Sequence, residues 1–237
     1  MGVAKQTFLK MAPVFPITQQ DQIARAGHQE NNTRDPHDLC VSDVDECWIY
    51  DRHGVCKTFH SLHQHSKAII IFVRNFLCYT CKEYVEDLGK IPQDMLQESN
   101  VRLVVIGQSS YSHIEGFCSL TGYPHEIYVD PERQIYKKLG MRRGETYMET
   151  PSNSPHVKSS LLIGSLRSMW RAMTSPAFDF QGDPLQQGGA LIVGPGPEVN
   201  FAHFDMNRFD HMPINWLLQL AGLHTLDFSD RSKVIDI

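Results

Sequence analysis

Two runs of apolar, mostly β-branched residues stand out in the pattern of hydrophobic and polar positions along the chain. They are KAIIIFV at 67–73 and VRLVVIG at 101–107. Continuous runs of this kind are typical of central strands that are covered on both faces. Between them, apolar residues recur at helical spacing over 78–98, and Gly89 and Pro92 indicate a break in that helix. The pattern therefore predicts a strand–helix–strand unit whose two strands are parallel neighbours.

Shorter patterns continue this alternation on both sides. Residues 46–60 alternate around DRHG, which predicts a hairpin turn with Gly54 in the left-handed region. The other expected elements are a helix over 111–121, a strand over 125–130, a helix that Asp130 caps and Gly140 ends, an antiparallel hairpin over 188–204 and a final helix over 213–222. Strands interleaved with helices predict an α/β domain with a mixed sheet.

The segments outside this alternation have a different character. Residues 1–42 are polar without a sustained period, and we expect them to form a flexible N-terminal extension. Residues 158–174 are strongly amphipathic, as in a helix that packs on a sheet, and carry too few positive charges for a membrane-surface helix. We therefore expect one domain over 43–225 with a helical insertion at about 142–187, followed by a tail over 226–237.

Composition narrows the functional classes. The chain has 237 residues, of which 41% are hydrophobic, and its formal net charge is −5. These values favour a globular protein, and the chain has no basic stripe that would suit nucleic acid. Neither a transmembrane run of 18 apolar residues nor the apolar region of a signal peptide is present. We therefore expect a cytoplasmic protein whose cysteines are mostly reduced.

The most informative motif is the Cys-x-x-Cys formed by Cys78 and Cys81, between the first apolar run and the helix that follows it. Unpaired backbone N–H groups at a helix N-terminus favour a thiolate over a thiol. In such motifs the cysteine pKa falls from about 8.5 into the range of about 3.5–7.5. A second thiol three residues later can close a disulfide. The motif therefore predicts a redox-active dithiol.

Two other interpretations of the cysteine pair stay open. Structural zinc usually takes four Cys or His ligands, and a second Cys-x-x-Cys is absent. The segment HSLHQH offers His60, His63 and His65, on the connection into the first central strand. Alternatively, Cys78 and Cys81 are plain core thiols, because free cysteine is commonly buried.

Several motifs in one order resemble a known family. FVRNFLCYTCKEYVEDLGKIP, VIGQSS, EIYVDPERQIYKKLGM and GDPLQQGGALIVGPG are similar to the peroxiredoxin-like 2 group of AhpC/TSA-type proteins, over about residues 45–225. The resemblance implies a thioredoxin-like fold of the peroxiredoxin type, with a mixed central sheet flanked by helices.

The resemblance also implies roles for three residues. Peroxiredoxins carry Thr-x-x-Cys with the last cysteine attacking the peroxide, which corresponds to Cys81, whereas thioredoxins attack with the first cysteine, which corresponds to Cys78. Arg74 either replaces the arginine with which peroxiredoxins hold the peroxide or is a charge that reaches solvent. Because Cys81 shares the apolar helix face with Tyr84 and Leu88, we expect Cys81 to attack and Cys78 to resolve.

The resulting hypothesis is a thiol-dependent oxidoreductase that reduces a peroxide or endoperoxide through Cys78 and Cys81, with Arg74 in the site. We expect no bound cofactor or metal. Reducing equivalents would come from thioredoxin or glutathione, and ultimately from NADPH. The alternative is a non-enzymatic redox-sensing adaptor, whose thiol pair reports oxidation to a signalling partner.

Overall fold

The structure is a computed structural model that describes residues 39–145 and 182–228. Most of the expected N-terminal extension, most of the expected helical insertion and the end of the tail lie outside these residues. The described ends of the insertion lie side by side, since the Gly144 N–H donates to the Leu185 carbonyl at 2.7 Å and the Gln187 N–H to the Arg142 carbonyl at 2.9 Å.

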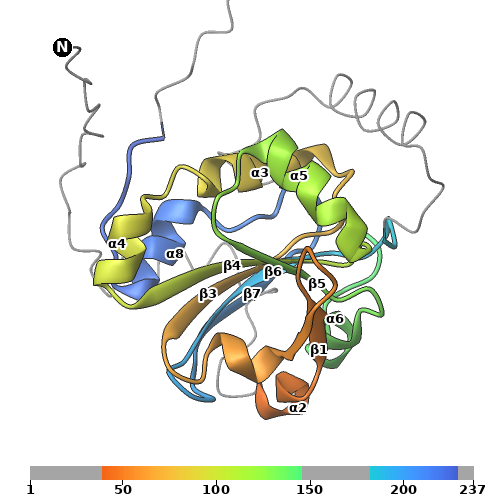
Figure 1. Cartoon of the computed structure of the whole chain (residues 1–237), viewed down its shortest axis with the longest axis horizontal. Helices are drawn as coiled ribbons and strands as arrows, with labels where there is room; N and C mark the ends of the chain where they lie inside the picture. Colours follow the sequence, from red (N-terminus) through yellow and green to blue (C-terminus); the bar gives the residue numbers. More distant parts are fainter. Residues whose placement is uncertain (1–38, 146–181, 229–237) are drawn as a thin grey trace, which may run out of the picture.

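A mixed sheet forms the centre of the described part of the chain (Figure 1). Its strands, in the order β2-β1-β5-β4-β3-β6-β7 across the sheet, are β1 Trp48–Tyr50, β2 Cys56–Thr58, β3 Lys67–Phe72, β4 Val101–Gly107, β5 Glu126–Val129, β6 Gly189–Val193 and β7 Val199–Phe204. Strands β3, β4 and β5 are parallel, and β6, β7, β1 and β2 are joined antiparallel at the two sides.

The register confirms the strand pairings that the sequence predicts. Lys67 lies opposite Val101 and Phe72 opposite Ile106, so β3 and β4 are parallel neighbours along their whole shared length. Strands β6 and β7 form the expected antiparallel hairpin. The DRHG turn joins β1 to β2, with Gly54 at a φ of +76°.

Helices and short 3-10 segments connect the strands. They are α2 Ser42–Asp45, η2 Phe59–Leu62, α3 Tyr79–Leu88, α4 Gln93–Glu98, η3 Tyr111–His113, α5 Ile114–Thr121, α6 Gln134–Lys138 and α8 Ile214–Ala221. The expected helix over 78–98 is interrupted at Gly89 and Pro92, as predicted, and forms two helices, α3 and α4. The helix after Asp130 begins later than expected, at Gln134. Arg133 adopts a φ of +57°, and the Asp130 carboxylate accepts the N–H groups of Gln134 and Ile135.

The sheet separates two hydrophobic cores, because successive side chains of a strand point to opposite faces. Ile69 and Ile71 belong to the core under α3, α5 and α8, whereas Ile70 and Phe72 belong to the core under α2 and α6. Figure 1 shows these helices in layers on the two faces. The architecture confirms the thioredoxin-like mixed sheet with flanking helices. Cys78 and Cys81 lie in the first core.

The packed domain extends beyond the expected limits of 43–225. Leu39 and Val41 are buried in the second core, and Leu226 is buried in the first. Leu226 is also fixed by two hydrogen bonds to the side chain of Asn215, each 2.8 Å long. Within the described residues, no helix has the length and apolar character needed to cross a bilayer.

Gly188, directly before β6, allows this strand to approach the end of β3. A Cβ atom at Gly188 would lie 2.0 Å from the Phe72 carbonyl oxygen, and the Gly188 carbonyl accepts the N–H of Asp205 at 3.0 Å. We expect Gly188→Ala to lower the free energy of unfolding by about 1–3 kcal/mol in urea denaturation, because the backbone must separate to admit the methyl group.

Gly116 is the matched control for this substitution. It is exposed on α5, and a Cβ there would meet nothing within 4 Å. Gly116→Ala should therefore raise stability by about 0.5–1 kcal/mol, since alanine favours a helix over glycine. Equal effects of the two substitutions would contradict the close approach at Gly188.

Candidate dithiol site

The turn between β3 and α3 places both cysteines at the start of a helix. The Asn75 carbonyl accepts the N–H of Cys78 at 3.2 Å, and the Asn75 side chain accepts the N–H of Leu77 at 3.1 Å. Cys78 is the N-cap residue, with extended backbone angles, and Cys81 is the third residue of α3. The first-turn N–H groups of α3 therefore point toward the region of the two sulfurs.

The two sulfur atoms have different neighbours. The Cys78 Sγ lies 3.1 Å from the Thr80 Oγ1 and accepts a hydrogen bond from the Arg74 Nη1 at 3.6 Å. The Cys81 Sγ lies 3.7 Å from the His211 Nε2. Cys78 is 8% exposed and Cys81 is fully buried, and both are free thiols.

These neighbours separate the two thiols electrostatically. A hydrogen bond from the Cys81 thiol, the positive charge of Arg74 and the Thr80 hydroxyl hold the pKa of Cys78 well below the ordinary cysteine value, in spite of its burial. Burial, followed by the hydrogen bond to Cys78 and the charge of Cys78, raises the pKa of Cys81 well above that value. Cys78 is therefore the more acidic thiol of the pair, and Cys81 the less acidic one. This geometry favours the opposite order of attack to the one that the sequence suggests.

Arg74 is buried, so the interpretation of Arg74 as a charge that reaches solvent is wrong. Its Nη2 donates to the Pro184 carbonyl at 2.8 Å and its Nε to the Gln186 carbonyl at 3.4 Å. The Glu145 carboxylate lies 3.2 Å from the same Nη2. Carbonyls from the segment before β6 therefore orient the guanidinium toward the Cys78 sulfur, and Glu145 balances its charge.

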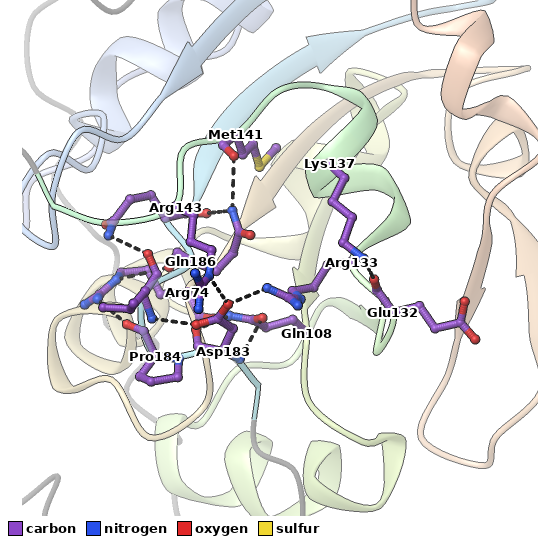
Figure 2. Close-up of polar contacts among 12 residues, drawn as sticks. Arg74, Gln108, Glu132, Arg133, Lys137, Met141, Arg143, Asp183, Pro184 and Gln186 are labelled. Atoms are coloured by element: carbon purple, nitrogen blue, oxygen red, sulfur yellow. Dashed lines mark hydrogen bonds and ion pairs between the residues drawn. The ribbon is translucent and has the colours of Figure 1, made fainter.

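A second clamp fixes the backbone of Arg74. Gln108, at the end of β4, is fully buried. Its Nε2 donates both to the Arg74 carbonyl and to the Asp183 carbonyl, the latter at 2.9 Å, while its Oε1 accepts the Asp183 N–H at 3.0 Å. One amide thus connects the end of β3, the end of β4 and the segment before β6, as Figure 2 shows.

The Asp183 carboxylate anchors this segment further (Figure 2). Its Oδ2 accepts hydrogen bonds from the Arg133 Nη1 at 2.5 Å and from the Arg143 Nε at 2.6 Å, and its Oδ1 accepts the Leu185 N–H at 3.0 Å. Charged hydrogen bonds of this kind are stronger than neutral ones. The carbonyls that hold Arg74 therefore belong to a fixed backbone.

Two buried polar side chains complete the surroundings of the dithiol. The ring of His211 stacks on Tyr84, with centroids 4.8 Å apart, and the Tyr84 hydroxyl donates to the Met212 carbonyl at 2.6 Å. Asp205, at the end of β7, is 2% exposed, and its Oδ2 has no hydrogen-bond partner within the described part of the chain. Burial, together with the negative charges of Asp210 and Cys78, raises the pKa of Asp205 well above its usual range.

Sequence reasoning named Cys78, Cys81 and Arg74, and the structure brings all three together. It missed five other residues that surround them, namely Thr80, Gln108, Glu145, Asp205 and His211. Thr80 lies inside the Cys-x-x-Cys motif and Gln108 follows a predicted central strand, so both had a positional signal. The other three come from loops and strand ends far along the chain, and no local pattern marks them.

Metal-ligand geometry is found elsewhere. Among the residues that the structure describes, one group of His, Cys, Asp or Glu side chains has the spacing of a metal site, formed by Asp45, His60 and His63. Neither Cys78 nor Cys81 belongs to it, and His65 does not either. The interpretation of the cysteine pair as a zinc site is therefore not supported by the described residues.

Comparison with known proteins identifies close relatives. A family model described as AhpC/TSA antioxidant enzyme matches residues 88–207, a range that begins after the two cysteines. The chain is 63% identical over 203 residues to peroxiredoxin-like 2C of Takifugu rubripes, covering 84% of this chain and 89% of the relative. It is 54% identical over 227 residues to peroxiredoxin-like 2C of Homo sapiens, covering 96% of this chain and 100% of the relative. It is 28% identical to prostamide/prostaglandin F synthase of Xenopus laevis, covering 69% and 78%.

The lowered pKa of Cys78 leads to a measurable titration. The thiolate absorbance of Cys78 is the difference between the natural chain and Cys78→Ser. We expect this absorbance to rise with a midpoint below about pH 8.5, the ordinary cysteine pKa. Arg74→Met should raise that midpoint by about one pH unit or more, because a positive charge within hydrogen-bond distance favours the thiolate. Arg52→Met, which alters an exposed ion pair with Glu115, is the control and should leave it unchanged. A low midpoint that survives in Cys78→Ser would assign the acidic thiol to Cys81.

The raised pKa of Asp205 predicts a gain in stability on its neutralisation. A carboxyl with a raised pKa in the folded state binds its proton less tightly in the unfolded chain, so stability falls as pH rises above about 3.9. Asp205→Asn should therefore be more stable than the natural chain at pH 7, by about 1 kcal/mol or more, and the difference should vanish at about pH 3. Thermal and urea unfolding across this range measure it. Glu198→Gln, at an exposed position, is the control, and a less stable Asp205→Asn at pH 7 would contradict the prediction.

Proposed function

The chain belongs to the peroxiredoxin-like 2 family, and we propose that it is a thiol oxidoreductase that reduces a peroxide or endoperoxide through Cys78 and Cys81. The observation that carries this proposal is the 3.6 Å contact between the Arg74 guanidinium and the Cys78 sulfur at the start of α3, with Cys81 three residues further along the same helix. A stabilised thiolate beside a protonated thiol is the arrangement that a two-cysteine reduction requires.

In the first step, the Cys78 thiolate attacks one oxygen of the O–O bond. The S–O bond forms as the O–O bond breaks, and the other oxygen leaves as an alkoxide or hydroxide. Cys78 is oxidised by two electrons to a sulfenic acid, or to a sulfenate ester when the substrate is an endoperoxide. The Arg74 guanidinium is the fixed positive charge that stabilises the departing oxygen, which takes up a proton.

In the second step, Cys81 resolves the oxidised Cys78. The Cys81 sulfur forms the S–S bond, and the oxygen on Cys78 leaves as water, or as the second hydroxyl of the reduced endoperoxide. The proton of the Cys81 thiol must be removed at this stage, and the His211 Nε2, 3.7 Å from the sulfur, is placed to accept it. A burial-raised pKa of Cys81 thus suits a resolving thiol better than an attacking one.

The cycle closes when external thiols reduce the Cys78–Cys81 disulfide. One thioredoxin dithiol, or two glutathione molecules that leave as glutathione disulfide, supply the two electrons, which come ultimately from NADPH. Cys78 is the sulfur such a reductant would attack, since it is 8% exposed and Cys81 is fully buried. No cofactor has to be held by the protein.

The similarity to a prostamide/prostaglandin F synthase adds endoperoxides to the substrates to be tested. The chemistry of the site itself does not distinguish a hydroperoxide from an endoperoxide, because the thiolate needs only an O–O bond and a stabilised leaving oxygen. The competing function is a redox-sensing adaptor, which the low exposure of Cys78, at 8%, favours, since a protein reductant would reach that sulfur only through a small opening.

Peroxide turnover separates these functions. With thioredoxin, thioredoxin reductase and NADPH, we expect the protein to consume many equivalents of hydrogen peroxide, an alkyl hydroperoxide or a bicyclic endoperoxide. An adaptor would consume about one equivalent and stop. The order of attack follows from variants treated with one equivalent of peroxide: Cys81→Ser should retain one rapid turnover and leave a sulfenic acid on Cys78 that dimedone traps.

Cys78→Ser should fall to the reactivity of an ordinary thiol, which is slower by orders of magnitude than an activated one. Cys118→Ser, on α5, is the control and should keep full turnover. Trapping on Cys81 in the Cys78→Ser variant would reverse the roles. Full activity in both single variants would remove the dithiol from the mechanism.

A further inference from the structure

Three side chains with metal-ligand atoms meet on the sheet face opposite the dithiol. Asp45 is the last residue of α2, His60 lies in η2, and His63 follows η2 directly. The Asp45 Oδ1 lies 3.0 Å from the His63 Nε2, and the Asp45 Oδ2 lies 3.2 Å from the His60 Nδ1. All three ligand atoms lie within 4.8 Å of one another.

The fold brings these residues together for reasons unrelated to their polarity. Val44 of α2 and Leu62 of η2 are both fully buried in the second core, so the two segments pack against each other. His60 and His63 are three residues apart at the 3-10 turn, where such side chains project in the same direction. Their rings lie 5.3 Å apart, centroid to centroid.

The donor and acceptor pattern around His63 calls for a cation. The His63 Nδ1 lies 2.8 Å from the Gly196 carbonyl oxygen, which only accepts hydrogen bonds, so Nδ1 carries a proton. In a neutral ring the Nε2 would then turn a lone pair toward the Asp45 carboxylate, another acceptor. The two atoms are 3.0 Å apart, too close for a water molecule to separate them, and the His63 side chain is 0% exposed. Either a second proton or a metal ion must stand between them.

We propose that the His60 Nδ1, the His63 Nε2 and the Asp45 carboxylate bind a divalent ion of the zinc class. Two imidazoles and one carboxylate are a common ligand set for zinc. Tetrahedral zinc with bonds of about 2.0–2.1 Å separates its ligand atoms by roughly 3.3–3.4 Å. The three ligand atoms of this site lie within 4.8 Å of one another, so small side-chain movements bring them to that spacing. The His60 side chain is 42% exposed and can rotate to complete the geometry.

The surroundings match those of established metal sites. Metal-bound histidines usually donate their other ring N–H to a carbonyl or carboxylate, as the His63 Nδ1 does to Gly196. Because the His60 side chain is 42% exposed, water can reach an ion bound here. Gly196 lies in the turn between β6 and β7, so an ion here would connect α2 and η2 to that hairpin. The folded protein alone assembles the three ligands, and zinc should therefore raise its melting temperature.

Zinc titration of the full chain carrying Cys78→Ser and Cys81→Ser tests the site without interference from the dithiol. Equilibrium dialysis should find one zinc ion that His60→Ala weakens about tenfold or more. His65→Ala is the matched control, since His65 is exposed on the same segment outside the group. Zinc should raise the melting temperature of the parent, which is the chain carrying Cys78→Ser and Cys81→Ser, and of the parent with His65→Ala. It should not raise that of the parent with His60→Ala, whose exposed side chain can be removed without loss of folding.

Cobalt replaces zinc as a spectroscopic probe of the ligands. A site of two imidazoles and a carboxylate should give weak d–d bands and lack the intense charge-transfer band of a metal-bound thiolate. Zinc binding of equal strength in the parent and in His60→Ala would overturn the proposal, as would a thiolate band that His60→Ala leaves unchanged. Absence of zinc binding would equally overturn the proposal. If NMR then finds a proton on both ring nitrogens of His63, a proton lies between the His63 Nε2 and the Asp45 carboxylate in place of a metal ion.

Discussion

The Arg74 guanidinium lies 3.6 Å from the Cys78 sulfur inside the protein, and a buried positive charge needs partners that hold it there. Burying an unpaired ion costs several kcal/mol, so the structure around Arg74 is organised to compensate for that charge. The carbonyls of Pro184 and Gln186 accept its hydrogen bonds, the Glu145 carboxylate balances it, and the Cys78 sulfur completes the set. Removing any one of them would leave part of the charge uncompensated.

The sheet makes this arrangement possible because three chain segments meet at the same end of its central strands. Strand β3 leads into Arg74 and the dithiol, β4 leads into Gln108, and the segment containing Asp183 leads into β6. Gln108 joins all three through hydrogen bonds, and Gly188 lets the third segment approach the first without a side chain between them. The parallel and antiparallel pairings of β3 therefore determine where the arginine meets the Cys78 sulfur.

The sequence by itself determined the central strands, the kinked helix between them and the cysteine pair at the start of that helix, because each depends on residues close together in the chain. The apolar runs at 67–73 and 101–107 and the spacing of Cys78 and Cys81 are local signals of this kind. The delayed start of α6 shows the limit of a local signal, since Asp130 caps the helix as expected, but the left-handed Arg133 moves its first residue.

Only the tertiary structure gives the two sulfurs different electrostatic surroundings. The sequence pattern favoured Cys81 as the attacking thiol from its place on the apolar helix face, but both cysteines lie at the same helix terminus, so the terminus itself does not distinguish them. The difference comes from Arg74 on one side and His211 on the other, and from the burial of Cys81, which depends on α8 and the strands beneath it. Electrostatic effects act over a few ångströms in space, and the groups that cause them here are up to 130 residues apart in the chain.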